Sequence, residues 1–312
     1  MKYISVKEAS KKWGITERRV RILCSENRID GVVKSSWAWN IPSTAKKPSD
    51  GRVLRHIKNI DLRVDSLNFN DLVKKKDTFN SITTNLKESE KYFDDSVNRF
   101  LLFALHEEDI DASDILLVLN NPNTIKVNFE IKTLILNSKS IIINIYKQTG
   151  YGPILPSDEI SNPFICEKRL KNIYQSIFRN IDDYYIPNYR FEMISNPSSF
   201  DLKEYDILKQ VEALIFQYER DWIMLNALVK ASFMFAGLLR IKPFEKHMFL
   251  FASIVFSAIL LEDGYPLAII PVSLIDELKA NLILTLKRSN YTKLINMFET
   301  SLIKELDVLI NL

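Results

Sequence analysis

The sequence contains little glycine and little cysteine, and each shortage excludes a class of protein. Only 7 glycines and 11 prolines occur in 312 residues, which argues against a loop-rich β protein and against a glycine-rich phosphate loop. The two cysteines, Cys24 and Cys166, cannot form a tetrahedral metal site, and their wide separation fits a reducing compartment. The hydrophobic content of 46% predicts a real core, and the shortage of glycine and proline favours a mainly helical fold.

Long hydrophobic runs are also missing. The longest, Met248–Leu261, is shorter than the roughly 18–20 residues that cross a bilayer, so it predicts a buried core helix. No apolar signal segment follows the N-terminal methionine, and we expect a cytoplasmic protein. The three histidines have no partner at helical spacing, which predicts neither a metal nor a cofactor: His56, His106 and His247.

Positive charge is concentrated at the start of the chain. Residues 1–52 carry twelve Lys and Arg against five acids, whereas the remainder carries thirty against thirty-four. This asymmetry indicates a small basic head with a polyanionic partner and a larger body that does not share it.

The head begins with the pattern of two short helices. Ser5 and Glu8 have the spacing of a capping box at the start of a first helix, and Gly14 is placed to end it. Thr16 is an N-cap candidate for a second helix. Residues 32–42 then read as two strands closed by Lys34-Ser35-Ser36, with Trp37 and Trp39 on one face as core. This segment resembles the winged helix-turn-helix of the MerR/excisionase group.

That resemblance implies binding to double-stranded DNA. The second helix would lie in the major groove and Lys34, at the tip of the wing, would touch the adjacent backbone. The predicted DNA-binding residues are Thr16, Arg18, Arg19, Arg21 and Lys34. A head of this size makes few phosphate contacts, so a homodimer that reads two half-sites is expected.

Composition divides the chain into three parts. The winged head covers residues 1–52, and a polar hinge with Pro48 and Gly51 marks its end. Residues 53–100 read as a charged helical linker, and residues 101–312 as a helical body. The body closes with an amphipathic helix pair whose leucine stripe suits either the core or a dimer face.

The body contains a second resemblance. Pro243, Phe244, the apolar run after them and Gly264-Tyr265-Pro266 resemble the active-site segment of Fic/Doc (Fido-fold) transferases, whose pattern is H-P-F-x-[DE]-G-N-G-R-x-x-R. The resemblance implies an all-helical Fido-like body with a short β flap. Pro187–Arg190 and the residues after them resemble the flap, with Tyr189, Arg190 and Phe191 as candidates for docking a protein partner.

The reactive residues of that pattern are absent. Lys242 stands at the position of the histidine base, and Lys246 replaces the acid that holds magnesium. His247 stands at the first glycine, while Leu250 and Ser253 replace the two arginines. The degenerate motif, Lys242-Pro243-Phe244-Glu245-Lys246-His247, therefore predicts a pseudoenzyme with no catalytic residue and no metal.

Two further interpretations concern the segment before the body core. Residues 102–107 are the best match to the inhibitory motif of self-regulating Fic proteins, with His106 at the glutamate position. The acids around it lack the pattern of a calcium loop and are expected to form a solvated helix start: Glu107, Glu108, Asp109 and Asp111.

The leading hypothesis is a DNA-binding transcriptional regulator whose inactive Fic-like body serves dimerisation, sensing or partner docking. One alternative is a nucleotidyl (AMP) transferase with a rebuilt site, in which Glu245 is the nearest candidate base. A second alternative is an antitoxin-like interaction protein that contacts its partner through the flap.

Overall fold

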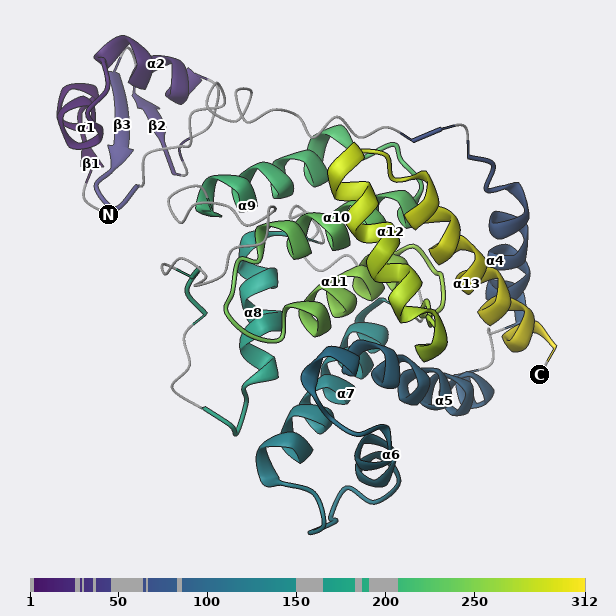
Figure 1. The fold of residues 1–312 in the computed structure, drawn as a ribbon. Helices are drawn as coiled ribbons and strands as arrows, with labels where there is room; N and C mark the ends of the chain where they lie inside the picture. Colours follow the sequence, from purple (N-terminus) through teal and green to yellow (C-terminus); the bar gives the residue numbers. More distant parts are fainter. Residues whose placement is uncertain are drawn as a thin grey trace. The chain divides into compact units, whose positions relative to one another are not determined.

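The chain divides into two compact units, residues 1–58 and 59–312 (Figure 1). The computed structural model describes residues 3–25, 29, 31–35, 38–45, 64–65, 67–82, 86–149, 165–182, 187–190 and 207–311, and backbone alone for residues 86–92 and 149. The predicted hinge at Pro48 and Gly51 lies outside the described residues.

The head is a pair of helices on a small antiparallel sheet. Helix α1 (Val6–Trp13) and helix α2 (Glu17–Ser25) are followed by strands β2 (Val33–Ser35) and β3 (Ala38–Pro42). Strand β1 (Tyr3–Ile4) pairs with the far edge of β3 and gives the order β1-β3-β2. This third strand, which the sequence did not predict, joins the start of the head to its last strand.

Local signals position the first helix as expected. The Ser5 hydroxyl accepts a hydrogen bond from the Glu8 N–H, and the Glu8 carboxylate accepts from the Ser5 N–H, so the predicted capping box is confirmed. Gly14 follows α1 with a φ of 63°, a left-handed conformation that glycine adopts without strain. Ala9, Trp13, Val20 and Leu23 then form the centre of a separate head core.

The hairpin differs in register from the prediction. Ser35 pairs with Ala38 and Lys34 pairs with Trp39, so Lys34 lies within β2 and not in the turn. The Lys34 ammonium lies 5.3 Å from the centre of the Trp39 ring, which is half-buried against the head core. Trp37 lies outside the described residues.

The body is built from helices, and two of them lie at its centre (Figure 1). The central pair is α10 (Ala227–Ile241) and α11 (Met248–Glu262). Around it lie α4 (Asn70–Ile82), α5 (Leu86–Ala104), α6 (Ala112–Asn120), α7 (Phe129–Thr149), α8 (Glu167–Ile177), α9 (Ile207–Phe216), α12 (Ile275–Arg288) and α13 (Thr292–Ile310).

Short helical turns connect several of these helices. Residues His106–Glu108 form a 3₁₀ turn, η1, between α5 and α6, and Val272–Leu274 form a second one, η4, before α12. Helix α9 continues directly into a π-helical segment, η3 (Gln217–Asp221).

Helix α11 is apolar on all sides, as its sequence predicts. Every residue from Leu250 to Leu261 is buried, so the helix has no solvent face over this stretch. No helix in the described part of the chain is long and apolar enough to cross a membrane. The expectation of a buried core helix is therefore confirmed.

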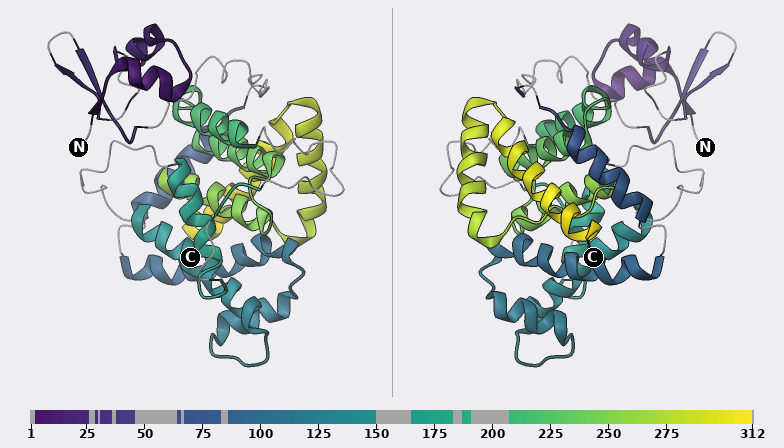
Figure 2. Two further views of the ribbon diagram at one scale, coloured as in Figure 1. Left: turned by 90° about the vertical axis from the view of Figure 1, so that its left-hand side faces the viewer. Right: turned by 90° about the vertical axis from the view of Figure 1, so that its right-hand side faces the viewer.

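The last two helices close the core. Leu278, Leu294, Phe298 and Leu302 are fully buried, and Phe298 packs on Phe256 of α11 with ring centres 4.3 Å apart. The leucine stripe of this pair thus belongs to the core and not to a dimer face. Helix α4 lies against α13 on the outer side (Figure 2).

The capping box gives a first test. Ser5→Ala removes a cap worth about 1 kcal/mol, so the amides at the start of α1 should exchange roughly fivefold faster in hydrogen–deuterium exchange of the full chain. Ser10→Ala is the matched control, because the Ser10 hydroxyl donates only to the Lys7 carbonyl within the same helix. Equal exchange in the two variants would contradict a stabilising role for the cap.

Candidate functional site

The degenerate motif forms the loop between α10 and α11. Lys242 ends α10 with a φ of 46°, and its N–H donates to the Leu238 carbonyl at 2.8 Å. His247 precedes α11 with a φ of 54°. Both residues are left-handed, a conformation that costs a non-glycine residue roughly 1–2 kcal/mol. The loop therefore needs anchors, and two neighbouring segments supply them.

The first anchor is an aromatic cluster under the loop. Phe244 is buried and stacks on Tyr174 of α8, with ring centres 3.8 Å apart and planes 11° apart. Phe251 meets both rings edge-on at 5.4 Å. The Tyr174 hydroxyl donates to the Lys246 carbonyl at 2.9 Å and lies 3.3 Å from the Lys246 N–H. Phe244 thus has a packing role in this loop, and Tyr174 holds the backbone two residues later.

Arg190 is the second anchor. Its side chain is buried, with 6% of the residue exposed, and its Nε donates to the Lys242 carbonyl at 2.7 Å. A second guanidinium nitrogen lies 3.4 Å from the Ile241 carbonyl, and the Arg190 N–H donates to the Pro243 carbonyl at 2.9 Å. Arg190 therefore caps the C-terminus of α10, where carbonyls lack helical partners and a cation is favourable.

This position does not favour the predicted docking role of Arg190, because its guanidinium faces the protein interior. Residues 187–190 contain no strand, so the predicted β flap is not found in them, and Phe191 lies outside the described residues. The sequence signal for Arg190 came from a resemblance, whereas its capping role depends on a contact with residues more than fifty positions away.

Tyr189 remains half-buried at the edge of the loop. Its hydroxyl lies 3.2 Å from the Glu167 carboxylate, and its ring lies 5.6 Å from that of Phe244. The Lys171 ammonium sits 4.6 Å over the same ring. Burial, and then repulsion by Glu167, raise the pKa of Tyr189 above its usual range, so the phenol stays neutral. The same two causes raise the pKa of the nearby Glu212.

One contact near the motif was not predicted. Glu108 lies 2.5 Å from His247 Nδ1, and both side chains are largely buried. Glu107 bridges to Lys279 at 2.6 Å. The expectation that this acidic segment is a solvated helix start is therefore wrong for Glu108, whereas Glu107, Asp109 and Asp111 are exposed. His106, placed at the inhibitory position by the sequence, is exposed.

The side chains of the loop do not fit a magnesium–nucleotide site. Lys246 is exposed at the position of the metal-binding acid, and the described residues contain no group of three His, Cys, Asp or Glu that could hold a metal. Leu250 and Ser253 are fully buried in the core. Glu245, the candidate base of a rebuilt site, is exposed and precedes Lys246 in the chain.

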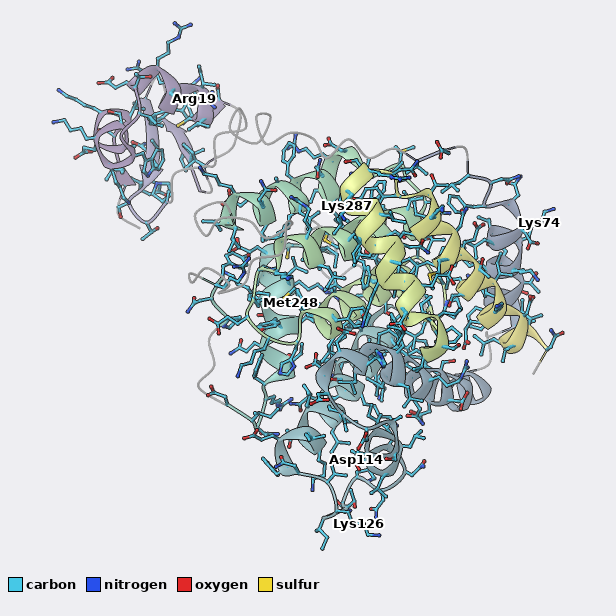
Figure 3. All side chains as sticks on the ribbon, in the orientation of Figure 1. Arg19, Lys74, Asp114, Lys126, Met248 and Lys287 are labelled. Atoms are coloured by element: carbon cyan, nitrogen blue, oxygen red, sulfur yellow. The ribbon has the colours of Figure 1, made fainter. Side chains whose placement is uncertain are left out.

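The head presents the predicted basic residues on α2. The Thr16 hydroxyl accepts a hydrogen bond from the Arg19 N–H at 3.3 Å, which makes Thr16 a cap for the helix. Arg21 forms an ion pair with Glu17 at 2.9 Å, and Arg18 is exposed. Figure 3 labels Arg19 on this helix, and Met248 at the start of α11 in the body. Lys34, on β2, is the remaining predicted DNA contact.

No protein-family model and no curated protein match the sequence. Solved structures do. A Fic domain containing signaling protein from Bacteroides thetaiotaomicron superposes with a TM-score of 0.61 at 14% identity, over 77% of this chain and 97% of that one. Fic-1 from C. elegans gives 0.58 at 13% identity, over 83% and 72%. A Fic family protein from Desulfovibrio desulfuricans gives 0.54 at 11% identity, over 79% and 76%.

These similarities define the fold of the helical body. It is an all-helical Fic (Fido) fold, as the motif resemblance predicted. At identities this low the likeness extends to the fold and leaves activity to be argued from the residues of this chain.

The anchoring role of Arg190 can be measured. Arg190→Met leaves the Ile241 and Lys242 carbonyls without their charged donor and should lower the free energy of unfolding in urea by about 2 kcal/mol. Arg288→Met, at an exposed arginine in the last turn of α12, is the control and should change it by less than about 0.5 kcal/mol. A loss no greater than that of the control would exclude the cap as a source of stability.

Proposed function

We propose that the protein is a DNA-binding transcriptional regulator of the cytoplasm and that its Fic-fold body has lost transferase chemistry. The observation that carries this proposal is the contrast between the two candidate sites. The head has a complete capped helix with exposed basic residues, whereas the motif loop has kept its packing residues and lost its reactive ones.

The head supports the proposal through geometry and charge together. Gly14 and Thr16 set α2 apart from α1 by a tight turn, which is the arrangement of a helix-turn-helix. Arg18 projects from the first turn of α2, where recognition residues reach base edges and phosphates. One turn later, the ion pair with Glu17 restrains the Arg21 side chain, so Arg21 approaches DNA in a defined geometry.

The Lys34 side chain of the wing is more restrained than the sequence predicts. Because Lys34 lies over Trp39, its ammonium is held close to the head core rather than extended from a turn. We propose that Lys34 makes one phosphate contact beside the groove that α2 reads. Contacts of this kind position a protein on the duplex but carry no sequence information.

The body supports the proposal because the motif residues of its loop make structural contacts. Phe244 and Leu250 are buried in the core, and the backbone at Lys242 is capped by Arg190. These contacts give the loop a structural purpose that needs no substrate. We propose that the body acts as the assembly or docking unit of the regulator.

A rebuilt transferase is the second candidate, and only the presence of the exposed Glu245 in the motif loop favours it. Two lysines of the loop could attract phosphates, but the described residues contain no group of three His, Cys, Asp or Glu to hold the metal that would accompany them. An antitoxin-like role would use Tyr189, which is half-buried at the edge of the loop.

DNA binding provides the main test. The double variant Arg18→Ala/Arg19→Ala should weaken binding to the promoter of its own gene at least about tenfold, because each phosphate or base contact is worth about 1–3 kcal/mol. The slope of log affinity against log salt should also fall by about 1 for each phosphate that the variant no longer neutralises. Fluorescence anisotropy at two salt concentrations measures both.

Lys287→Ala/Arg288→Ala is the matched control, since it removes two exposed cations from the end of α12 in the body (Lys287 is labelled in Figure 3). It should bind like the unchanged protein. If the head variant binds promoter DNA as tightly as the control, the regulator proposal fails.

Nucleotide binding separates the second candidate from the first. In isothermal titration calorimetry with ATP and magnesium we expect no saturable heat at millimolar nucleotide, because Lys246 repels the metal. Glu245→Ala should leave the result unchanged. Saturable binding, together with modification of a test protein that Glu245→Ala abolishes, would establish the transferase instead.

A further inference from the structure

Three consecutive apolar side chains are exposed between η3 and α10. Ile223, Met224 and Leu225 are 66%, 90% and 38% exposed, and we refer to them as the apolar tip. Exposed runs of this kind are uncommon in soluble proteins unless they bind something. The π-helix that precedes the tip is a feature often found at functional sites.

An apolar pocket lies directly beside the tip. Its volume is about 340 Å³, and every lining residue is apolar: Val64, Leu67, Phe69, Trp222, Leu225, Val229 and Phe233. Leu225 belongs to both features, so tip and pocket form one continuous surface. Its lining residues come from the segment before α4 and from residues 222–233, which include the start of α10.

We infer that this surface binds a second copy of the same chain. A projecting apolar group next to a receiving apolar pocket is self-complementary, because a twofold axis between two copies lets each tip enter the pocket of the other at once. Met224 is suited to the projecting role, since an unbranched thioether adapts to the shape of a pocket. A large buried side chain at the centre of an interface is also the usual hot spot of association.

The connection to the head favours the same occupant. Val64, on the pocket wall, is the first body residue that the structure describes, and eighteen residues separate it from Ala45 of the head. A dimer formed here would bring both attachment points to one interface. Eighteen residues span at most about 60 Å, so two heads so attached can reach half-sites about 34–36 Å apart. This step rests on the proposed DNA-binding function, whereas the fit of tip and pocket does not.

The leucine stripe of the last two helices does not serve this role. The leucine stripe of α12 and α13 packs into the core, with Leu278, Leu294 and Leu302 fully buried. Those side chains offer no surface to a second copy.

The test is the association state of the full-length protein without DNA, followed by sedimentation velocity over a range of concentrations. The unchanged protein should form a dimer. Met224→Glu should weaken the dimer by about a hundredfold or more, because it would place a carboxylate in a pocket with no polar partner. Val64→Glu, which alters the pocket from the receiving side, should have the same effect.

Ile125→Glu is the matched control. Ile125 is 94% exposed in the turn between α6 and α7, so the same substitution introduces the same charge away from the proposed surface. This variant should stay dimeric, and all variants should keep the thermal unfolding midpoint of the unchanged protein to within a few degrees. A monomer at every concentration, or a dimer that both Met224→Glu and Val64→Glu leave intact, overturns the inference.

The two proposals fail separately. Arg18→Ala/Arg19→Ala should lose DNA binding and stay dimeric, which tests the head alone. Met224→Glu should become monomeric and retain only weak, single-head binding to DNA. If the unchanged protein is a dimer through the tip but does not bind promoter DNA, the proposed DNA-binding function is contradicted and the inferred dimer surface is supported.

Discussion

The burial of helix α11 from Leu250 to Leu261 constrains the rest of the body. A helix with no solvent face needs neighbours on every side, and α11 packs against α5, α7, α8 and α10. Its backbone polar groups are satisfied within the helix, so only its two ends require outside partners. The body is thus organised around α11, a rod of apolar side chains. Polar groups can gather in the loops at the two ends of this helix.

The N-terminal end of that rod is closely packed by aromatic and aliphatic side chains. Phe249 meets Phe103 and Phe235 edge-on, and Leu250 is buried. Glu108 and His247 face each other where the helix begins. A helix N-terminus normally favours anions, and here a protein carboxylate already lies beside it. The start of the helix therefore already has a negatively charged neighbour from the protein itself.

Structural features were predictable from the sequence when the residues that cause them lie close together along the chain. The capping box of Ser5 and Glu8, the stop at Gly14 and the burial of α11 follow from residues a few positions apart, and all three were predicted. The short strand β1 and the contact of Glu108 with His247, 139 residues apart, could not be predicted, because nothing local announces a distant partner. Lys34 was placed wrongly because a small difference in hairpin register moves a side chain from the turn into a strand.

The motif resemblance located the candidate loop, but it assigned Arg190 by analogy. A buried arginine that caps α10 has no signature in a single sequence. Its role is visible only once residues 187–190 and 241–243 lie together.

The backbone at His247 is left-handed, which bears on the choice of residue at this position. Glycine occupies this position in the Fic pattern, yet the chain keeps a positive φ there with an imidazole side chain. A positive φ at this position therefore does not require glycine, and the main chain of the loop accommodates an imidazole side chain there.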